Sequence, residues 1–198
     1  MKLGIYGGAF NPIHNGHVII AISVLEKLNL DKLIIVPTYN PPHRSKEDLA
    51  PYEYRRKWVK IAFEDIRNIY VSDFEKEKGG VSYSIETIEF FSKKYGVKPF
   101  FIIGEDSAIN FDKWYRYKEL KKLATFVVYP RFRDSMLRSI KIKHPEFIVL
   151  DDLPIVEISS TEIRNNIKKN KSIRGMVDRK IEGEVIEVYR KIIQYGGD

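Results

Sequence analysis

Short apolar stretches alternate with longer amphipathic ones along this chain. Apolar stretches rich in β-branched and aromatic residues predict strands, because such residues fit the pleated surface of a buried sheet. Between them, apolar residues recur with the spacing of helices. The predicted strands are Lys2–Tyr6, Lys32–Pro37, Asn68–Ser72, Pro99–Ile103, Thr125–Tyr129 and Glu146–Leu150. The predicted helices are Gly16–Leu28, Tyr52–Asp65, Ser84–Tyr95 and Tyr115–Leu123, with a weaker pattern near Asp134–Ile140.

Most of the predicted strands lack polar alternation, which indicates burial on both faces. Strands that alternate with helices are typical of a parallel sheet covered by helices on both sides, so we expect a doubly wound, Rossmann-like α/β fold. After Asp151 the pattern changes to two successive helices, Ser159–Lys168 and Arg179–Tyr195. The 198 residues suit one domain, in which residues 159–198 form a small helical extension at the C-terminus.

Composition narrows the class of protein. Hydrophobic residues make up 43% of the chain and charged residues 31%, which suits a packed core. The longest apolar stretch, Val18–Leu25, is too short to cross a bilayer, and Met1–Tyr6 runs into a strand with no secretion signal, so we expect a cytoplasmic protein with no membrane contact. The absence of cysteine excludes disulfides and cysteine chemistry. A net charge of +7 suits nucleic acid and small anionic substrates equally.

The strongest chemical signal lies directly after the first predicted strand. The loop from Gly7 to His17 reads Gly-Gly-Ala-Phe-Asn-Pro-Ile-His-Asn-Gly-His. Its glycines let the backbone approach a phosphate closely, and the helix that follows offers free N–H groups to an anion. His14 and His17 are three residues apart at the helix start, so both imidazoles can donate hydrogen bonds to a polyphosphate. The same pair could instead be structural, a reading we consider weaker inside a glycine loop.

A second motif, Ile158-Ser159-Ser160-Thr161-Glu162-Ile163-Arg164, opens a predicted helix. Ser159 and Glu162 have the spacing of a capping box, which alone explains those two residues. Hydroxyls at a helix start with an arginine one turn later also suit a polyphosphate. The motif therefore fits both a cap and a phosphate site.

Three further segments carry weaker signals of a binding site. A proline-rich loop, Val36–Arg44, is either a substrate loop or an ordinary turn. After the strand Pro99–Ile103 come Gly104 and Asp106, where the carboxylate suits ribose hydroxyls. Trp114 suits stacking on a heteroaromatic ring, although a tryptophan by default belongs to the core.

Together these motifs resemble the nicotinate/nicotinamide mononucleotide adenylyltransferase family, and most closely its bacterial nicotinate branch. The resemblance runs in order from the first strand to Arg164 and includes the segment Ser82–Thr87. It differs at Asn11, where Asp is more usual, at Ser84, where Thr is common, and at Val177-Asp178, where Val-Pro is often found.

The resemblance implies a role for each matching residue. His14, His17 and Arg164 would act on the ATP phosphates, and Trp114 would stack on the pyridine ring. Main-chain amides near Ser84 and Tyr115 would receive the nicotinate carboxylate. The implied ATP site comprises Gly7, Gly8, Ala9, Phe10, Gly104, Asp106, Ile158, Ser159, Ser160, Thr161 and Arg164. The implied mononucleotide site comprises Asn11, Arg44, Ser84, Thr87, Trp114 and Tyr115.

The expected reaction is attack of the mononucleotide phosphate on the α-phosphorus of ATP, with loss of pyrophosphate. We expect Mg²⁺ to be bound through the ATP phosphates, with no metal held by protein side chains. The small-molecule partners are ATP and nicotinate mononucleotide, with no nucleic acid; a homo-oligomer is compatible with the sequence. The alternatives are nicotinamide mononucleotide or dual specificity, another acceptor such as phosphopantetheine, and a nucleotide- or RNA-binding module without catalysis.

Overall fold

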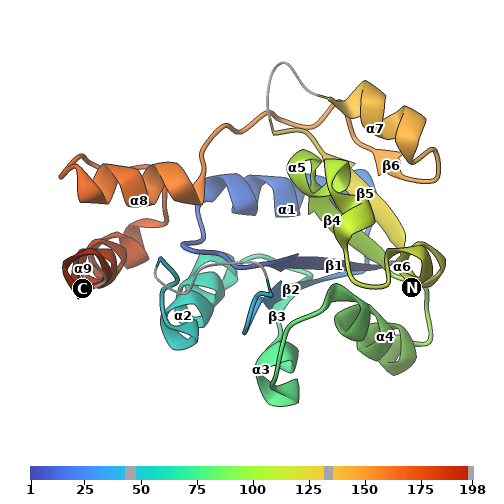
Figure 1. Cartoon of the computed structure of the whole chain (residues 1–198), viewed down its shortest axis with the longest axis horizontal. Helices are drawn as coiled ribbons and strands as arrows, with labels where there is room; N and C mark the ends of the chain where they lie inside the picture. The colour runs from blue at the N-terminus through green and yellow to red at the C-terminus, as the bar shows by residue number, and fades with distance from the viewer. Residues whose placement is uncertain (43–47, 132–135, 196–198) are drawn as a thin grey trace.

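A twisted parallel sheet forms the centre of the molecule (Figure 1). The computed structural model describes residues 1–42, 48–131 and 136–195. In this part of the chain six strands lie side by side in the order β3-β2-β1-β4-β5-β6, and every neighbouring pair is parallel. The strands are β1 (Leu3–Gly8), β2 (Lys32–Pro37), β3 (Ile69–Val71), β4 (Phe100–Gly104), β5 (Thr125–Tyr129) and β6 (Ile148–Val149). The strand order reverses between β1 and β4, where sheets of this kind bind ligands beyond their carboxyl ends.

Helices cover both faces of the sheet, as the strand and helix pattern predicts. Alternate residues of each strand point to opposite faces, so Leu3 and Ile5 of β1 join one apolar cluster while Tyr6 joins the other. The cluster with Tyr6 includes α1 (Asn15–Lys27), α2 (Tyr52–Phe63), α8 (Ser160–Lys168) and α9 (Arg179–Tyr195). The opposite cluster includes α4 (Ser84–Tyr95), α5 (Glu105–Ile109), α6 (Tyr117–Leu123) and α7 (Leu137–Lys143). The doubly wound α/β class is confirmed.

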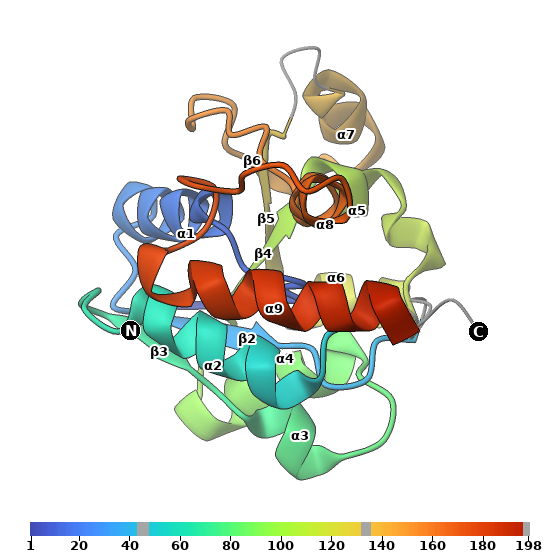
Figure 2. The same cartoon turned by 90° about the vertical axis from the view of Figure 1, so that its left-hand side faces the viewer.

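The expected C-terminal helices pack onto this core. α9 lies beside α2 in the view of Figure 2, and its Ile181, Val185 and Tyr189 are buried in the cluster that α2 shares. The Nε1 atom of Trp58 in α2 donates a 2.8 Å hydrogen bond to Glu184 of α9. No helix in the described residues combines the length and apolar composition needed to span a bilayer.

Most predicted bounds agree with the structure to within two residues, and three local features differ. The strand expected over Glu146–Leu150 is only Ile148–Val149, because a turn closed by the 3.0 Å bond from Phe147 N to His144 O occupies its start. The helix expected near Asp134–Ile140 corresponds to α7, which begins at Leu137 and ends at Lys143, while Asp134 lies outside the described residues. The sequence pattern did not indicate α3 (Phe74–Lys78), α5 or the 3-10 turn Phe111–Lys113, because each is too short to show a helical period.

Candidate active site

A cavity of about 500 Å³ opens at the carboxyl ends of β1, β2, β4 and β5. Residues from each of the predicted motifs line it. The predicted site residues in its wall are Gly7, Gly8, Ala9, Phe10, His14, His17, Ser84, Thr87, Gly104, Asp106, Trp114, Tyr115, Ser159, Ser160 and Thr161. Asn11, Ile158 and Arg164 do not line it, and Arg44 lies outside the described residues. The fold therefore brings motifs separated by more than a hundred residues to one cavity.

The two histidines stack on each other at the start of α1. Their ring centroids are 3.7 Å apart, and the Nδ1 atom of His17 accepts a 3.2 Å hydrogen bond from the backbone N–H of His14. A ring nitrogen that accepts a hydrogen bond carries no proton, so in this arrangement the ring proton of His17 is on Nε2, which acts as the donor. Burial, and secondly the charge of Arg131, lowers the pKa of His14 from 6.5 to about 3. His14 is therefore a neutral hydrogen-bonding group near pH 7.

Gly16 permits this stacking. A Cβ atom on Gly16 would lie 3.0 Å from Nδ1 of His14 and 3.0 Å from Cγ1 of Val156, closer than such atoms normally approach. The Nδ1 atom of His14 is buried and has no hydrogen-bond partner within the described structure.

The second motif forms the start of α8 and lies against the histidine loop. The Oγ atom of Ser159 caps the helix by accepting a 3.1 Å bond from the N–H of Glu162, as the capping pattern predicted. Ser160 Oγ donates to the carbonyl of Pro12 at 2.8 Å, and Arg164 Nη1 donates to the carbonyl of Asn11 at 2.8 Å. Ser159, Ser160 and Thr161 line the cavity. Arg164 does not line it, and its guanidinium stabilises the histidine loop through the carbonyl of Asn11.

Asn11 has structural contacts of its own. It is 2% exposed, its Nδ2 donates to the carbonyl of Asp48 at 2.7 Å, and its Oδ1 accepts from the N–H of Ala50 at 2.9 Å. The hydroxyl of Tyr189 donates to the same Oδ1 at 2.6 Å. The role of Asn11 in mononucleotide binding remains a prediction, and these side-chain contacts do not support it.

One end of the cavity is aromatic. Trp114 is half-buried, with its ring edge-on to Phe101 at 6.3 Å, and the exposed Tyr115 ring lies 4.5 Å from that of Tyr83. Ser84 is the first residue of α4, so the N-terminus of this helix faces the same end. The partial positive charge of a helix start favours an anionic group there.

Glu75 is a residue of this end that the sequence did not indicate. It is 5% exposed, and its Oε1 accepts a 3.1 Å bond from the hydroxyl of Thr87 while its Oε2 accepts a 3.1 Å bond from the N–H of Tyr39. Burial raises the pKa of its carboxyl group. Thr87 therefore serves to hold Glu75 in this structure, which no local sequence pattern could have shown.

A charged pair also lines the cavity. Arg131, which follows β5, donates from Nη1 to Oδ2 of Asp106 at 2.9 Å. Nearby, the hydroxyls of Tyr6 and Tyr129 are 3.0 Å apart. Sequence reasoning missed Arg131, Tyr6 and Tyr129, although a charged residue directly after a strand at this edge was an available signal.

No group of three or more His, Cys, Asp or Glu side chains suited to a metal ion occurs in the part of the chain that the structure describes. The cavity wall offers imidazoles, hydroxyls and the Arg131 guanidinium to a phosphorylated ligand.

Comparison with known proteins identifies the family to which this chain is similar. Residues 5–166 match the model of the cytidylyltransferase-like family. A Thermotoga maritima protein with the curated name "Probable nicotinate-nucleotide adenylyltransferase" is 48% identical over 200 residues, which cover 99% of this chain and 93% of that protein. A Clostridium acetobutylicum protein of the same curated name is 41% identical, over 91% of this chain and 94% of the relative.

Solved structures of low identity share the fold. A Plasmodium falciparum nicotinic acid mononucleotide adenylyltransferase complexed with NaAD superposes with a TM-score of 0.79. The two chains are 19% identical, and the match covers 99% of this chain and 96% of the other. The similarity extends through α9, beyond the range of the family model.

Proposed function

Because the chain belongs to the cytidylyltransferase-like family, and within it to the nicotinate-nucleotide adenylyltransferases, we propose that it transfers the adenylyl group of ATP to nicotinate mononucleotide. The products are deamido-NAD and pyrophosphate, so the reaction builds the dinucleotide skeleton of NAD. One observation carries this proposal: a single cavity is lined by both histidines, by Ser159–Thr161 and by the aromatic end with Trp114.

The donor side comprises the loop after β1 and the start of α8. An oxygen of the mononucleotide 5′-phosphate attacks the α-phosphorus of ATP, and the bond from that phosphorus to the bridging oxygen breaks, releasing pyrophosphate. The nucleophile is already an anion near pH 7, so no general base is required. Neutral His14 and the neighbouring His17 donate hydrogen bonds to phosphate oxygens, whose negative charge grows in the transition state. Because the stacked rings are held in place before the reaction, little reorganisation is needed when that charge develops.

Mg²⁺ enters with ATP as part of the substrate and neutralises phosphate charge when bound. Ser159, Ser160 and Thr161 contribute hydroxyls to the wall of the cavity, and Asp106 is placed to accept from ribose hydroxyls. Arg131 holds the Asp106 carboxylate through its 2.9 Å contact.

The acceptor side explains a preference for the acid. The indole of Trp114 offers a face to the pyridine ring, and the N-terminus of α4 at Ser84 favours a carboxylate over a neutral amide. Nicotinamide mononucleotide keeps the ring contact and loses the charge interaction.

Pyrophosphate release tests this proposal when ATP and Mg²⁺ are supplied with nicotinate mononucleotide or with nicotinamide mononucleotide in parallel. We expect kcat/KM to favour the acid by about a hundredfold, on the order of 3 kcal/mol in transition-state binding. Similar values would indicate dual specificity. Release with neither acceptor would contradict the proposed acceptor and turn attention to phosphopantetheine.

A further inference from the structure

Arg55 is a charged side chain inside the protein. It lies in α2 and is 1% exposed. Its Nε donates to the carbonyl of Ala50 at 2.8 Å, and its Nη1 donates to the carbonyls of Ala9 at 2.7 Å and Thr38 at 2.8 Å. Nη2 lies 3.4 Å from the carbonyl of Tyr39. A guanidinium removed from water is costly unless its hydrogen bonds are made, so these carbonyls are held firmly in place.

Three of these four carbonyls, those of Ala9, Thr38 and Tyr39, belong to two loops at the cavity. Ala9 follows β1 and precedes His14 in the donor loop, whereas Thr38 follows β2. Both residues line the cavity. Because one nitrogen, Nη1, bonds both carbonyls, Arg55 fixes the separation of the two loops behind the cavity wall.

The loop after β2 is joined in turn to the acceptor side. The N–H of Tyr39 donates to Glu75, and the N–H of Asn40 donates to Oγ of Ser82 at 3.1 Å. Glu75 accepts from Thr87 in the first turn of α4, and Ser82 lies two residues before the start of that helix. A continuous set of hydrogen bonds therefore runs from the donor loop through Arg55 to the helix that faces the acceptor end.

We propose that Arg55 is a positioning residue that sets the distance between bound ATP and the bound mononucleotide. The proposal rests on the proposed function, because it assumes that both substrates occupy this cavity. Direct transfer requires the attacking oxygen and the phosphorus to lie about 3–3.5 Å apart, and small errors in that separation are costly to the rate. Arg55 touches neither substrate and acts through the two loops.

Arg55→Lys tests the proposal while keeping the charge. A lysine ammonium is a compact point charge and cannot hold the diverging carbonyls as the planar guanidinium does. We expect kcat to fall about 10- to 100-fold. The Kd values of ATP and of nicotinate mononucleotide, measured separately by calorimetry, should change by less than about threefold, because each half of the site remains intact.

Deamido-NAD supplies the readout that a merely structural role would not move. The dinucleotide spans both halves, so its Kd should rise by about the same factor as kcat falls. Calorimetric stoichiometry reports the fraction of folded protein and separates this effect from partial unfolding. An unchanged kcat and an unchanged Kd for deamido-NAD would overturn the proposal. An equal rise in the Kd values of ATP, nicotinate mononucleotide and deamido-NAD would overturn it as well.

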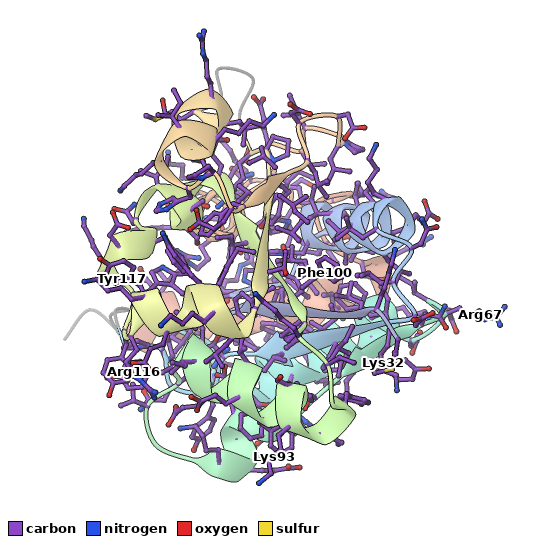
Figure 3. The ribbon with its side chains drawn as sticks, turned by 90° about the vertical axis from the view of Figure 1, so that its right-hand side faces the viewer. Lys32, Arg67, Lys93, Phe100, Arg116 and Tyr117 are labelled. Carbon is purple, nitrogen blue, oxygen red and sulfur yellow. The ribbon has the colours of Figure 1, made fainter. Side chains whose placement is uncertain are left out.

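Arg67→Lys is the matched control, because Arg67 is exposed and lies at the rim of the molecule in Figure 3. It should behave as the unaltered protein. Should Arg55→Lys fail to fold, Glu75→Gln loosens the same loop from the acceptor side and should weaken the dinucleotide more than either substrate; failure to do so would overturn the proposal. Unaltered protein that forms no deamido-NAD would contradict the proposed function itself.

Discussion

The hydroxyl of Tyr189 donates a 2.6 Å hydrogen bond to Oδ1 of Asn11, 178 positions earlier in the chain. Both side chains are buried. A second contact joins this part of the chain to the histidine loop: the N–H of Asn15, next to His14, donates to the carbonyl of Met176 at 2.8 Å. α9 and the segment that precedes it therefore support the loop that carries the two histidines.

Tyr189→Phe removes this one hydroxyl and keeps the ring. We expect the free energy of unfolding to fall by about 1–2 kcal/mol, because a hydrogen bond at a buried oxygen is lost. We also expect a lower kcat, since the loop before His14 loses a support. Urea denaturation and steady-state kinetics measure the two effects. Tyr70→Phe is the control, because the Tyr70 ring in β3 is half-exposed, and it should change neither the free energy of unfolding nor kcat. If Tyr189→Phe gave the same values as Tyr70→Phe, the Tyr189 hydroxyl would not support the histidine loop.

Gly16→Ala should disturb the histidine pair. The added methyl group would press on the His14 ring and on Val156, so we expect a loss of about 1–3 kcal/mol in stability and a lower kcat. Gly183→Ala is the control, because Gly183 also lies in a helix and an added Cβ meets nothing within 4 Å. That substitution should stabilise the protein by about 0.5–1 kcal/mol through helix propensity. Equal effects at both glycines would show that contact with His14 is unimportant.

The lowered pKa of His14 should make the free energy of unfolding decrease in acid. In the folded protein its pKa is about 3, against 6.5 for an ordinary histidine. Between these two values the unfolded chain binds a proton that the folded one does not, so stability falls as pH falls from about 6.5 towards 3. The expected slope from this group is at most about 1.4 kcal/mol per pH unit.

His14→Gln removes that proton uptake. Unfolding free energies measured at several pH values below 6.5 should therefore decline less steeply in His14→Gln than in the unaltered protein. Parallel curves would mean that His14 is protonated in the folded state as readily as in the unfolded one.

A single hydrogen-bond donor, the backbone N–H of Ser84, can be removed from the N-terminus of α4. Ser84→Pro removes one backbone N–H at the first helical position, where proline is well tolerated. The preceding residue, Tyr83, has φ −108° and ψ 131°, the extended conformation that proline requires before it. Because a hydrogen bond to a charged group contributes about 1.5–3 kcal/mol, we expect selectivity for the acid to fall about 10- to 100-fold.

Ser84→Ala is the companion variant, since it keeps the N–H and loses only the hydroxyl. Its ratio of kcat/KM for acid over amide should remain near that of the unaltered protein. If Ser84→Ala lost as much selectivity as Ser84→Pro, the hydroxyl and not the backbone would be responsible for recognising the carboxylate.

Much of the fold could be predicted because its elements carry strong periodic signals. The strands β2 and β5 and the helix α4 have the predicted bounds, and α4 ends at Gly96 in the left-handed conformation that glycine favours. The local pattern failed where the element was short or charged. α3 reads Phe-Glu-Lys-Glu-Lys and is held through buried Glu75 and through Phe74, whose ring stacks on Phe90.

The candidate site was predictable as far as its motifs were contiguous. Residues around His14, Ser84, Trp114 and Ser159 were found because neighbouring residues identify them. Arg55, Glu75 and Arg131 were not found, because each acts through contacts with distant segments and stands alone among ordinary surface-type charges in the sequence. Burial gives Arg55 and Glu75 their roles, and burial of a single charged residue is set by the tertiary structure.

The central claim is adenylyl transfer within one cavity, and the position of a phosphorus label tests it most directly. ATP labelled at the α-phosphorus or at the γ-phosphorus is incubated with Mg²⁺ and nicotinate mononucleotide, using the unaltered protein and His17→Ala. We predict that the α label appears in deamido-NAD and the γ label in pyrophosphate. We further predict that His17→Ala slows both by about 10²–10³-fold, as loss of a transition-state donor does. A γ label released as orthophosphate, or an unimpaired His17→Ala, would contradict the account.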